Sequence, residues 1–192
     1  MPKPREGAEA RVPLVDENPL DPIVAEVFAR FAVEDRSPIA LYRALALVPA
    51  VLRGYGAMAS GVRYETALES DLRELVILRI AQLTGSAYEW AHHRPLAAAV
   101  GISEQQLASL TAWEDSEDFD LRQKAALRLA DEMHLLEVTD ETFESVRGVL
   151  GEQRAVELVV ISAFYEAVAR IIQGLGIAVE DGYSDYLAPY SQ

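Results

Sequence analysis

Apolar residues recur at helical spacing through most of the chain, and no stretch alternates apolar and polar residues as a strand would. Two stretches, 71–83 and 155–175, are apolar on nearly every side, which is typical of helices buried in a core. The pattern predicts an all-α fold of about seven or eight helices. Two such apolar helices also favour oligomerisation, because one small bundle would not bury both.

Turn and capping signals divide the chain into three parts. The first 20 residues contain four prolines and no periodicity, which predicts an extended N-terminal arm, 1–20. Asp21-Pro22 is typical of a helix start and opens a single domain, 21–180. The C-terminal tail, 181–192, needs an apolar surface to pack on, here or on a neighbouring subunit, because it holds Tyr183, Tyr186 and Tyr190.

Prolines, glycines and short polar residues predict where individual helices bend, begin and end. Pro49 predicts a kink or break, and Pro95 predicts a kink or split after His93 or Arg94. Ser70 is expected to cap the first very apolar helix. Gly85 ends that helix in the manner of a C′ glycine.

Charge and composition exclude several classes of partner. The formal net charge is −14, so phosphate backbones and anionic membranes are poor partners. Hydrophobic residues make up 51% of the chain, which is an ordinary proportion for a globular protein. We expect no transmembrane span and no secretory signal, which makes the cytoplasm the default location. The chain has no cysteine, so disulfides, thiolate metal sites and thiol redox chemistry are excluded.

Candidate chemistry gathers in the stretch from Glu74 to Gly101, which holds two of the three histidines. Glu74 lies in an apolar helix, where a carboxylate must be paired or change its pKa. The next helix carries one polar stripe with two further polar residues beside it (Ser86, Glu89 and His93; Tyr88 and His92). Glu89 precedes the two histidines by three and four residues, so it can orient an imidazole and raise its pKa.

Other interpretations of these residues stay open. Glutamate and histidine on a helix often form a solvated face, and Tyr88 is more often a packing residue than a catalytic one. The Glu-x-x-His spacing could instead present metal ligands: Glu89, His92 and His93, with Glu74 or His134 as further candidates. Asp131, three residues before His134, could complete a second such pair, although an exposed ion pair explains it equally well.

At these residues the sequence resembles the carboxymuconolactone decarboxylase family, which includes alkylhydroperoxidase D. That family's motif is a glutamate, a Cys-x-x-Cys pair twelve residues later, and a histidine four residues after the second cysteine. Glu74 and His93 match the glutamate and the histidine, while Ser86 and Glu89 replace the cysteines. Tyr88 stands where the peroxidase has a relay histidine. The resemblance implies the helical AhpD-like fold and a homotrimer or homohexamer with sites near subunit interfaces.

The missing cysteines determine the chemistry that we expect. Thiol-based hydroperoxide reduction is excluded, and the family's members without the pair act by acid–base chemistry on lactones and keto acids. The leading hypothesis is therefore a lyase that needs no cofactor and decarboxylates a small carboxylated or lactone metabolite. Glu74, Glu89 and His93 would be catalytic, with His93 oriented by Glu89 as proton donor or base. Ser86, Tyr88 and His92 would bind substrate. A metal-dependent enzyme and a non-catalytic ligand-binding oligomer remain alternatives.

Overall fold

The computed structural model describes residues 10–33 and 37–187, and all regular structure in these ranges is helical. The N-terminal half holds α1 (Pro22–Val33), α2 (Ala40–Leu45), α3 (Pro49–Tyr64), α4 (Ser70–Thr84) and α5 (Ala87–Ala99). The C-terminal half holds α6 (Glu104–Ser109), α7 (Leu121–Leu135), α8 (Asp140–Leu150) and α9 (Glu152–Leu175), with short 3₁₀ helices η1 (Leu110–Asp115) and η2 (Asp181–Tyr186). The all-α class is confirmed.

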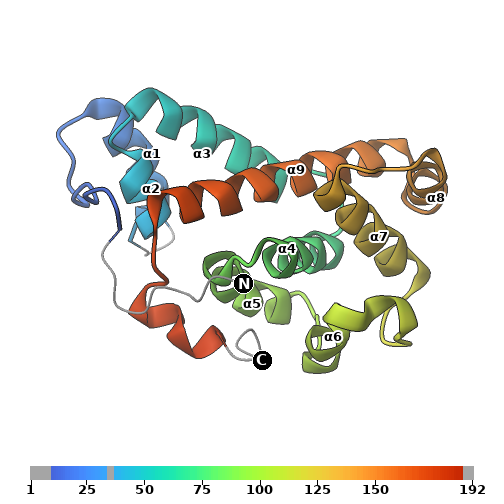
Figure 1. Cartoon of the computed structure of the whole chain (residues 1–192). Helices are drawn as coiled ribbons and strands as arrows, with labels where there is room; N and C mark the ends of the chain where they lie inside the picture. Colours follow the sequence, from blue (N-terminus) through green and yellow to red (C-terminus); the bar gives the residue numbers. More distant parts are fainter. Residues whose placement is uncertain (1–9, 34–36, 188–192) are drawn as a thin grey trace.

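Helix α4 is the centre of the molecule and packs against α5, α7 and α9 (Figure 1). Its apolar side chains are fully buried in several directions, as its sequence predicted. They contribute to two apolar clusters, one shared with α7, α8 and α9 and one shared with α5, α6 and η1. A third cluster joins α1, α2 and the C-terminal part of α9. A polar side chain on the α5-facing side of α4 is therefore shut away from water.

One proline prediction is confirmed and one needs correction. Pro49 breaks the helical stretch, because α2 ends at Leu45 and Pro49 begins α3 as a separate helix; the described residues contain nine α-helices rather than seven or eight. A proline at the first helical position loses nothing, because the N–H it lacks would have no partner there. Pro95 does not split α5, which runs unbroken to Ala99. This helix packs along α4, and tertiary packing offsets the missing hydrogen bond.

Most predicted caps are correct, with small shifts. The Asp21 carboxylate accepts from the N–H groups of Ile23 and Val24 at 2.8 and 3.1 Å. Gly85 ends α4 in the left-handed conformation, with φ of 72°. Ser70 is the first residue of α4 rather than its cap, and the capping position falls on Glu69, whose side chain makes no capping bond.

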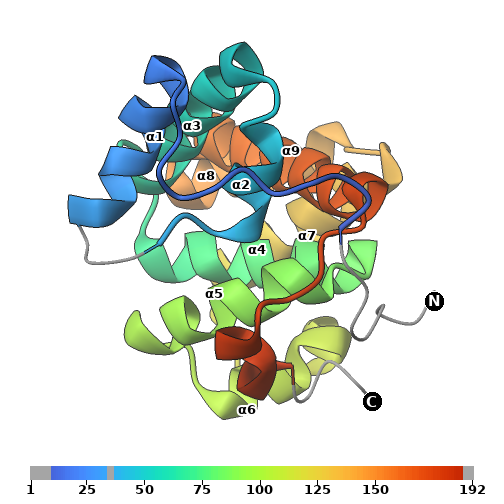
Figure 2. The ribbon, with the colours of Figure 1, turned by 90° about the vertical axis from the view of Figure 1, so that its left-hand side faces the viewer.

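The described parts of the arm and the tail both dock on the helical body. Arg11 donates from its backbone N–H to Leu175 and from its side chain to Gln173 and Gly174, so it satisfies carbonyls at the end of α9. Residues 1–9 of the arm and Tyr190 of the tail lie outside the described residues. Beyond α9 the chain turns back, and η2 lies alongside α5 (Figure 2).

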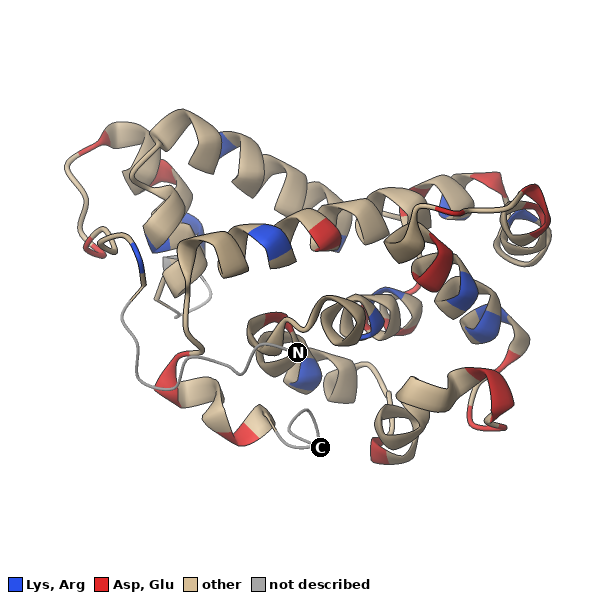
Figure 3. Ribbon diagram, in the orientation of Figure 1, with Lys and Arg blue, Asp and Glu red and all other residues tan. Residues whose placement is uncertain are grey.

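Acidic positions occur along most elements, including α1, α9 and η2 (Figure 3). No helix in the described ranges has the length and hydropathy needed to cross a membrane.

Candidate active site

The centre of the site is a buried pair between α4 and α5. His93 Nδ1 lies 2.7 Å from Glu74 Oε2, and the two side chains expose only 10% and 3% of their surface. Arg73 adds a contact of 3.3 Å between its Nε and Glu74 Oε1. The edge of the Tyr165 ring, from α9, faces the imidazole with centroids 5.0 Å apart. Three helices thus fix the position of one imidazole.

The environment sets the protonation of this pair. Burial would raise the pKa of Glu74, but the hydrogen bond and charge of His93, with Arg73 and Arg63, outweigh it and lower that pKa. Burial also lowers the pKa of His93, against the opposing effect of Glu74. Burial thus favours the neutral form of the imidazole, and the partners of Glu74 favour its carboxylate form. Because Nδ1 must donate to the carboxylate, Nε2 carries the free electron pair.

Glu89 is a second buried carboxyl with the opposite behaviour. Only 2% of it is exposed, and neither carboxyl oxygen has a hydrogen-bond partner among the described residues. Burial raises the pKa of Glu89 to about 8, assisted by the negative charge of Glu166 and opposed by the nearby Ser86 hydroxyl. Glu89 is accordingly a neutral acid at pH 7. Two buried carboxyls whose pKa values are shifted in opposite directions can serve as a general acid and as the partner of a base.

The predicted pairing within α5 is not what the structure contains. Glu89 was expected to orient His93, but the imidazole bonds to Glu74 on the neighbouring helix. The sequence spacing brings residues four apart onto one helix face, yet the packing of α5 on α4 decides which acid meets the ring. Ser86 caps α5, its hydroxyl accepting from the Glu89 N–H at 3.4 Å.

A second polar group forms where the chain returns after α9. The carboxylate of Glu180 accepts from the Tyr88 hydroxyl at 2.9 Å and from the Ala40 N–H at 2.7 Å, and contacts His92 Nε2 at 2.7 Å. Burial acts to raise the pKa of Glu180, but these partners, His92 first, lower it. The Tyr88 and His92 rings are stacked with centroids 4.3 Å apart, and Tyr183 of η2 stacks on His92 at 3.7 Å. Tyr88 and His92 therefore hold the segment after α9 against α5.

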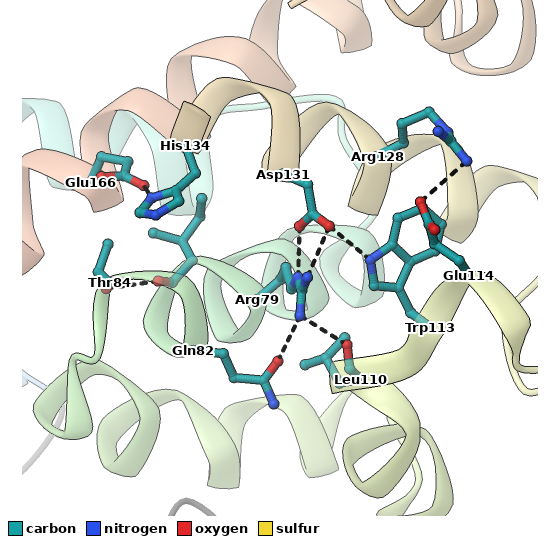
Figure 4. A network of polar contacts seen from close by, with 11 residues as sticks. Arg79, Gln82, Thr84, Leu110, Trp113, Glu114, Arg128, Asp131, His134 and Glu166 are labelled. Atoms are coloured by element: carbon teal, nitrogen blue, oxygen red, sulfur yellow. Dashed lines mark hydrogen bonds and ion pairs between the residues drawn. The ribbon is translucent and has the colours of Figure 1, made fainter. Parts of the chain in front are cut away.

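The alternative metal ligands are not brought together. Glu89, His92 and His93 have different surroundings, and no group of three or more acids and histidines in the described ranges could hold a metal ion. Asp131 also does not join His134: it forms a two-pronged contact with Arg79 at 2.6 and 2.8 Å, and Trp113 donates to it (Figure 4). His134 bonds instead to Glu166 at 2.6 Å (Figure 4).

Sequence reasoning missed several members of the site. Glu166 and Tyr165 lie in the apolar helix α9, where the argument applied to Glu74 holds equally for a buried carboxylate. Glu180 is the first acid after an apolar stretch, Ile177 to Val179, but its partners lie far away in sequence. Arg63, at the end of α3, carries no motif at all.

The architecture is that of an AhpD-like helical protein. One solved structure with this fold is the alkylhydroperoxidase core of a peroxidase-related protein from Ralstonia eutropha, with a TM-score of 0.78, 17% identity and coverage of 91% of this chain and 94% of that one. Another is the debrominase Bmp8 in complex with 2,3,4-tribromopyrrole, with a TM-score of 0.75, 16% identity and coverage of 93% and 98%.

The sequence identifies the family itself. Residues 49–132, which contain α3, α4 and α5, match the carboxymuconolactone decarboxylase family, and the chain belongs to it. The protein YdfG of Bacillus subtilis is 31% identical over 100 residues, which cover 50% of this chain and 68% of that one. The resemblance read from Glu74, Gly85 and His93 is confirmed.

Proposed function

We propose that this protein is an acid–base lyase that decarboxylates a small carboxylated or lactone metabolite. One observation carries the proposal: His93 is held by the buried Glu74 carboxyl at 2.7 Å, and a second buried carboxyl, Glu89, whose pKa is raised by burial, lies one turn before that imidazole in the same helix. The family's name supports a carboxylated lactone as the class of substrate. The tribromopyrrole complex of a protein with the same fold supports a small ring compound as ligand.

Decarboxylation needs the proton that Glu89 can supply. When a β-keto or vinylogous acid loses CO₂, the carbon–carbon bond breaks and its electron pair remains on carbon as an enolate or dienolate. Glu89 gives its proton to that carbon, and the resulting buried carboxylate regains a proton from solvent. One proton is consumed for each CO₂ released. His93 Nε2, held in place by Glu74, can accept a hydrogen bond or a proton from the substrate.

The roles of the two glutamates therefore differ from the sequence hypothesis, in which Glu89 oriented His93 and Glu74 was a further catalytic carboxylate. Glu74 orients the histidine and fixes its tautomer, while Glu89 is the acid. Substrate binding by Ser86, Tyr88 and His92 remains a prediction, as do the cytoplasmic location and independence from any cofactor. Thiol chemistry has no residue to perform it, because the chain contains no cysteine.

The test is CO₂ release from a panel of β-keto acids and carboxylated lactones. Glu89→Gln and His93→Ala should each lower kcat by about 10²–10⁴-fold, as removal of a general acid or base does. Glu117→Gln, the same residue replacement in an exposed loop, is the matched control. Full activity of Glu89→Gln on an identified substrate would refute the assignment. A gain of stability in Glu89→Leu with unchanged ligand binding would indicate a non-catalytic binding protein.

A homotrimer or homohexamer is part of this proposal. The turn before α3 and one face of that helix expose large apolar residues, which favours burial against another subunit: Leu47, Val48, Val51 and Met58. Sedimentation analysis of the untagged protein tests this. A monomer at micromolar concentration would contradict it.

A further inference from the structure

A small pocket lies between α1 and α3, away from the candidate active site. Its volume is about 80 Å³, and its walls include the two arginines Arg30 and Arg63 together with the hydroxyl residues Tyr42, Ser60 and Tyr64. Neither Glu74 nor His93 lines it. A space of this size holds a carboxylate and a short carbon stub, but not a nucleotide.

The two arginines stand out against the charge of the chain. Acidic residues outnumber basic ones by 31 to 17, and most arginines of the structure have an acidic partner within reach. In the described part of the chain, no ion pair joins Arg30 or Arg63 to a carboxylate. Arg63 is half-buried and has the Tyr64 ring beside its guanidinium at 5.1 Å. A partly desolvated guanidinium that makes no contact ion pair is a ready partner for an external anion.

Arg63 also connects the pocket with the candidate active site. Its positive charge helps to lower the pKa values of Glu74 and His93, so it lies within electrostatic reach of both. A continuous series of ring contacts, each 4.8 to 5.4 Å between centroids, runs from the pocket wall to the imidazole: Phe31, Tyr42, Tyr55, Phe164, Tyr165 and His93. A row of packed aromatic rings therefore lies between the two sites.

We propose that the pocket between α1 and α3 binds a carboxylate of a small organic acid through Arg30 and Arg63. Arg63 forms the inner side of the site and Arg30 the outer side, and the hydroxyls of Ser60 and Tyr64 add donors. Ser60 now donates to Glu65 at 3.3 Å and can turn to a ligand. This binding site does not rest on the proposed function.

The binding test uses propionate and its neutral isostere propionamide, titrated by saturation-transfer NMR. We expect the unaltered protein to bind propionate with a dissociation constant on the order of millimolar, and propionamide at least about tenfold more weakly. Arg63→Ala and Arg30→Ala should each weaken propionate binding by about tenfold or more. Arg53→Ala, an exposed arginine of the same helix outside the pocket, should bind as the unaltered protein does.

A substitution without any change of charge provides a second test. A Cβ added at Gly56 would lie 3.5 Å from Val27 and 3.9 Å from Tyr42, both of which line the pocket, so Gly56→Ala narrows it without a clash. Alanine is also a better helix former than glycine. Gly56→Ala should therefore bind propionate more weakly while unfolding at a temperature no lower than that of the unaltered protein.

The outcomes separate the two proposals. Equal binding of propionate and propionamide, or unchanged affinity in Arg63→Ala, would overturn the carboxylate site. Inorganic phosphate that displaces propionate at lower concentration would overturn it in favour of a phosphate site. Propionate binding that is lost in Arg63→Ala but retained in Glu89→Gln supports the site whether or not any decarboxylase activity is found. Activity abolished by Glu89→Gln with no propionate binding would support the catalytic proposal alone.

Discussion

The buried acid Glu89 predicts an unusual dependence of stability on pH. Its pKa is about 8 in the folded protein and near its ordinary value of 4.5 in the unfolded chain. A carboxyl whose pKa is raised by folding stabilises the fold fully below pH 4.5, and this contribution is lost as the pH rises towards 8. The free energy of unfolding falls by about 1.4 kcal/mol for each pH unit, or roughly 5 kcal/mol over the whole range.

The assay compares urea unfolding of the unaltered protein and of Glu89→Gln at pH 5 and pH 8. Glutamine stays neutral at both, so other titrating groups cancel in the difference between the two proteins. Relative to Glu89→Gln, the unaltered protein should lose roughly 3 to 4 kcal/mol between pH 5 and pH 8. Glu117→Gln, in an exposed loop, serves as the matched control. A difference that does not change with pH would mean that Glu89 is hydrated or already ionised in solution, and the acid role would fall with it.

Three further substitutions probe the neighbouring contacts. Glu74→Gln should lower the His93 pKa further, seen by NMR titration of the imidazole, because Glu74 opposes the effect of burial; an unchanged titration would exclude the pair. Glu180→Gln should loosen the tail and speed proteolysis after α9, since the carboxylate holds Tyr88 and His92, and equal cleavage rates would contradict this contact. Arg79→Met should lower the free energy of unfolding in urea by about 1–3 kcal/mol, because it removes the arginine that pairs with the partly buried Asp131. It should leave kcat unchanged.

The elements of the fold follow from local signals, and the contacts of the site do not. The apolar pattern of α4 and the glycine at its end can be recognised in the sequence alone, because burial requires apolar residues and a positive φ favours glycine. The partner of His93 depends on how α5 is rotated against α4. The orientation of α5 against α4 decides whether the imidazole bonds to Glu89, four residues away, or to Glu74, nineteen residues away. No spacing rule makes that choice.

Residues that are distant in sequence explain the rest of the difference. Glu180 meets Tyr88 and His92 only because the chain folds back after α9, and Arg63 meets the pocket only through the packing of α1 on α3. Both are single charged residues at the end of an apolar or small-residue stretch. The motif of the family included both members of the buried pair, Glu74 and His93, and it gave no information on these two charges.

The docking of Arg11 on the end of α9 has a mechanical consequence. When the two ends of the described chain are pulled apart, the force is transmitted from the arm through the Arg11 contacts with Gln173 and Leu175. From there it reaches the short segment that leads to η2. Helix α4, which holds Glu74, lies outside this route, and α5 is joined to it through the contacts of Glu180 with Tyr88 and His92. Under force, release of the arm from α9 would be an extension that leaves the contact between Glu74 and His93 in place.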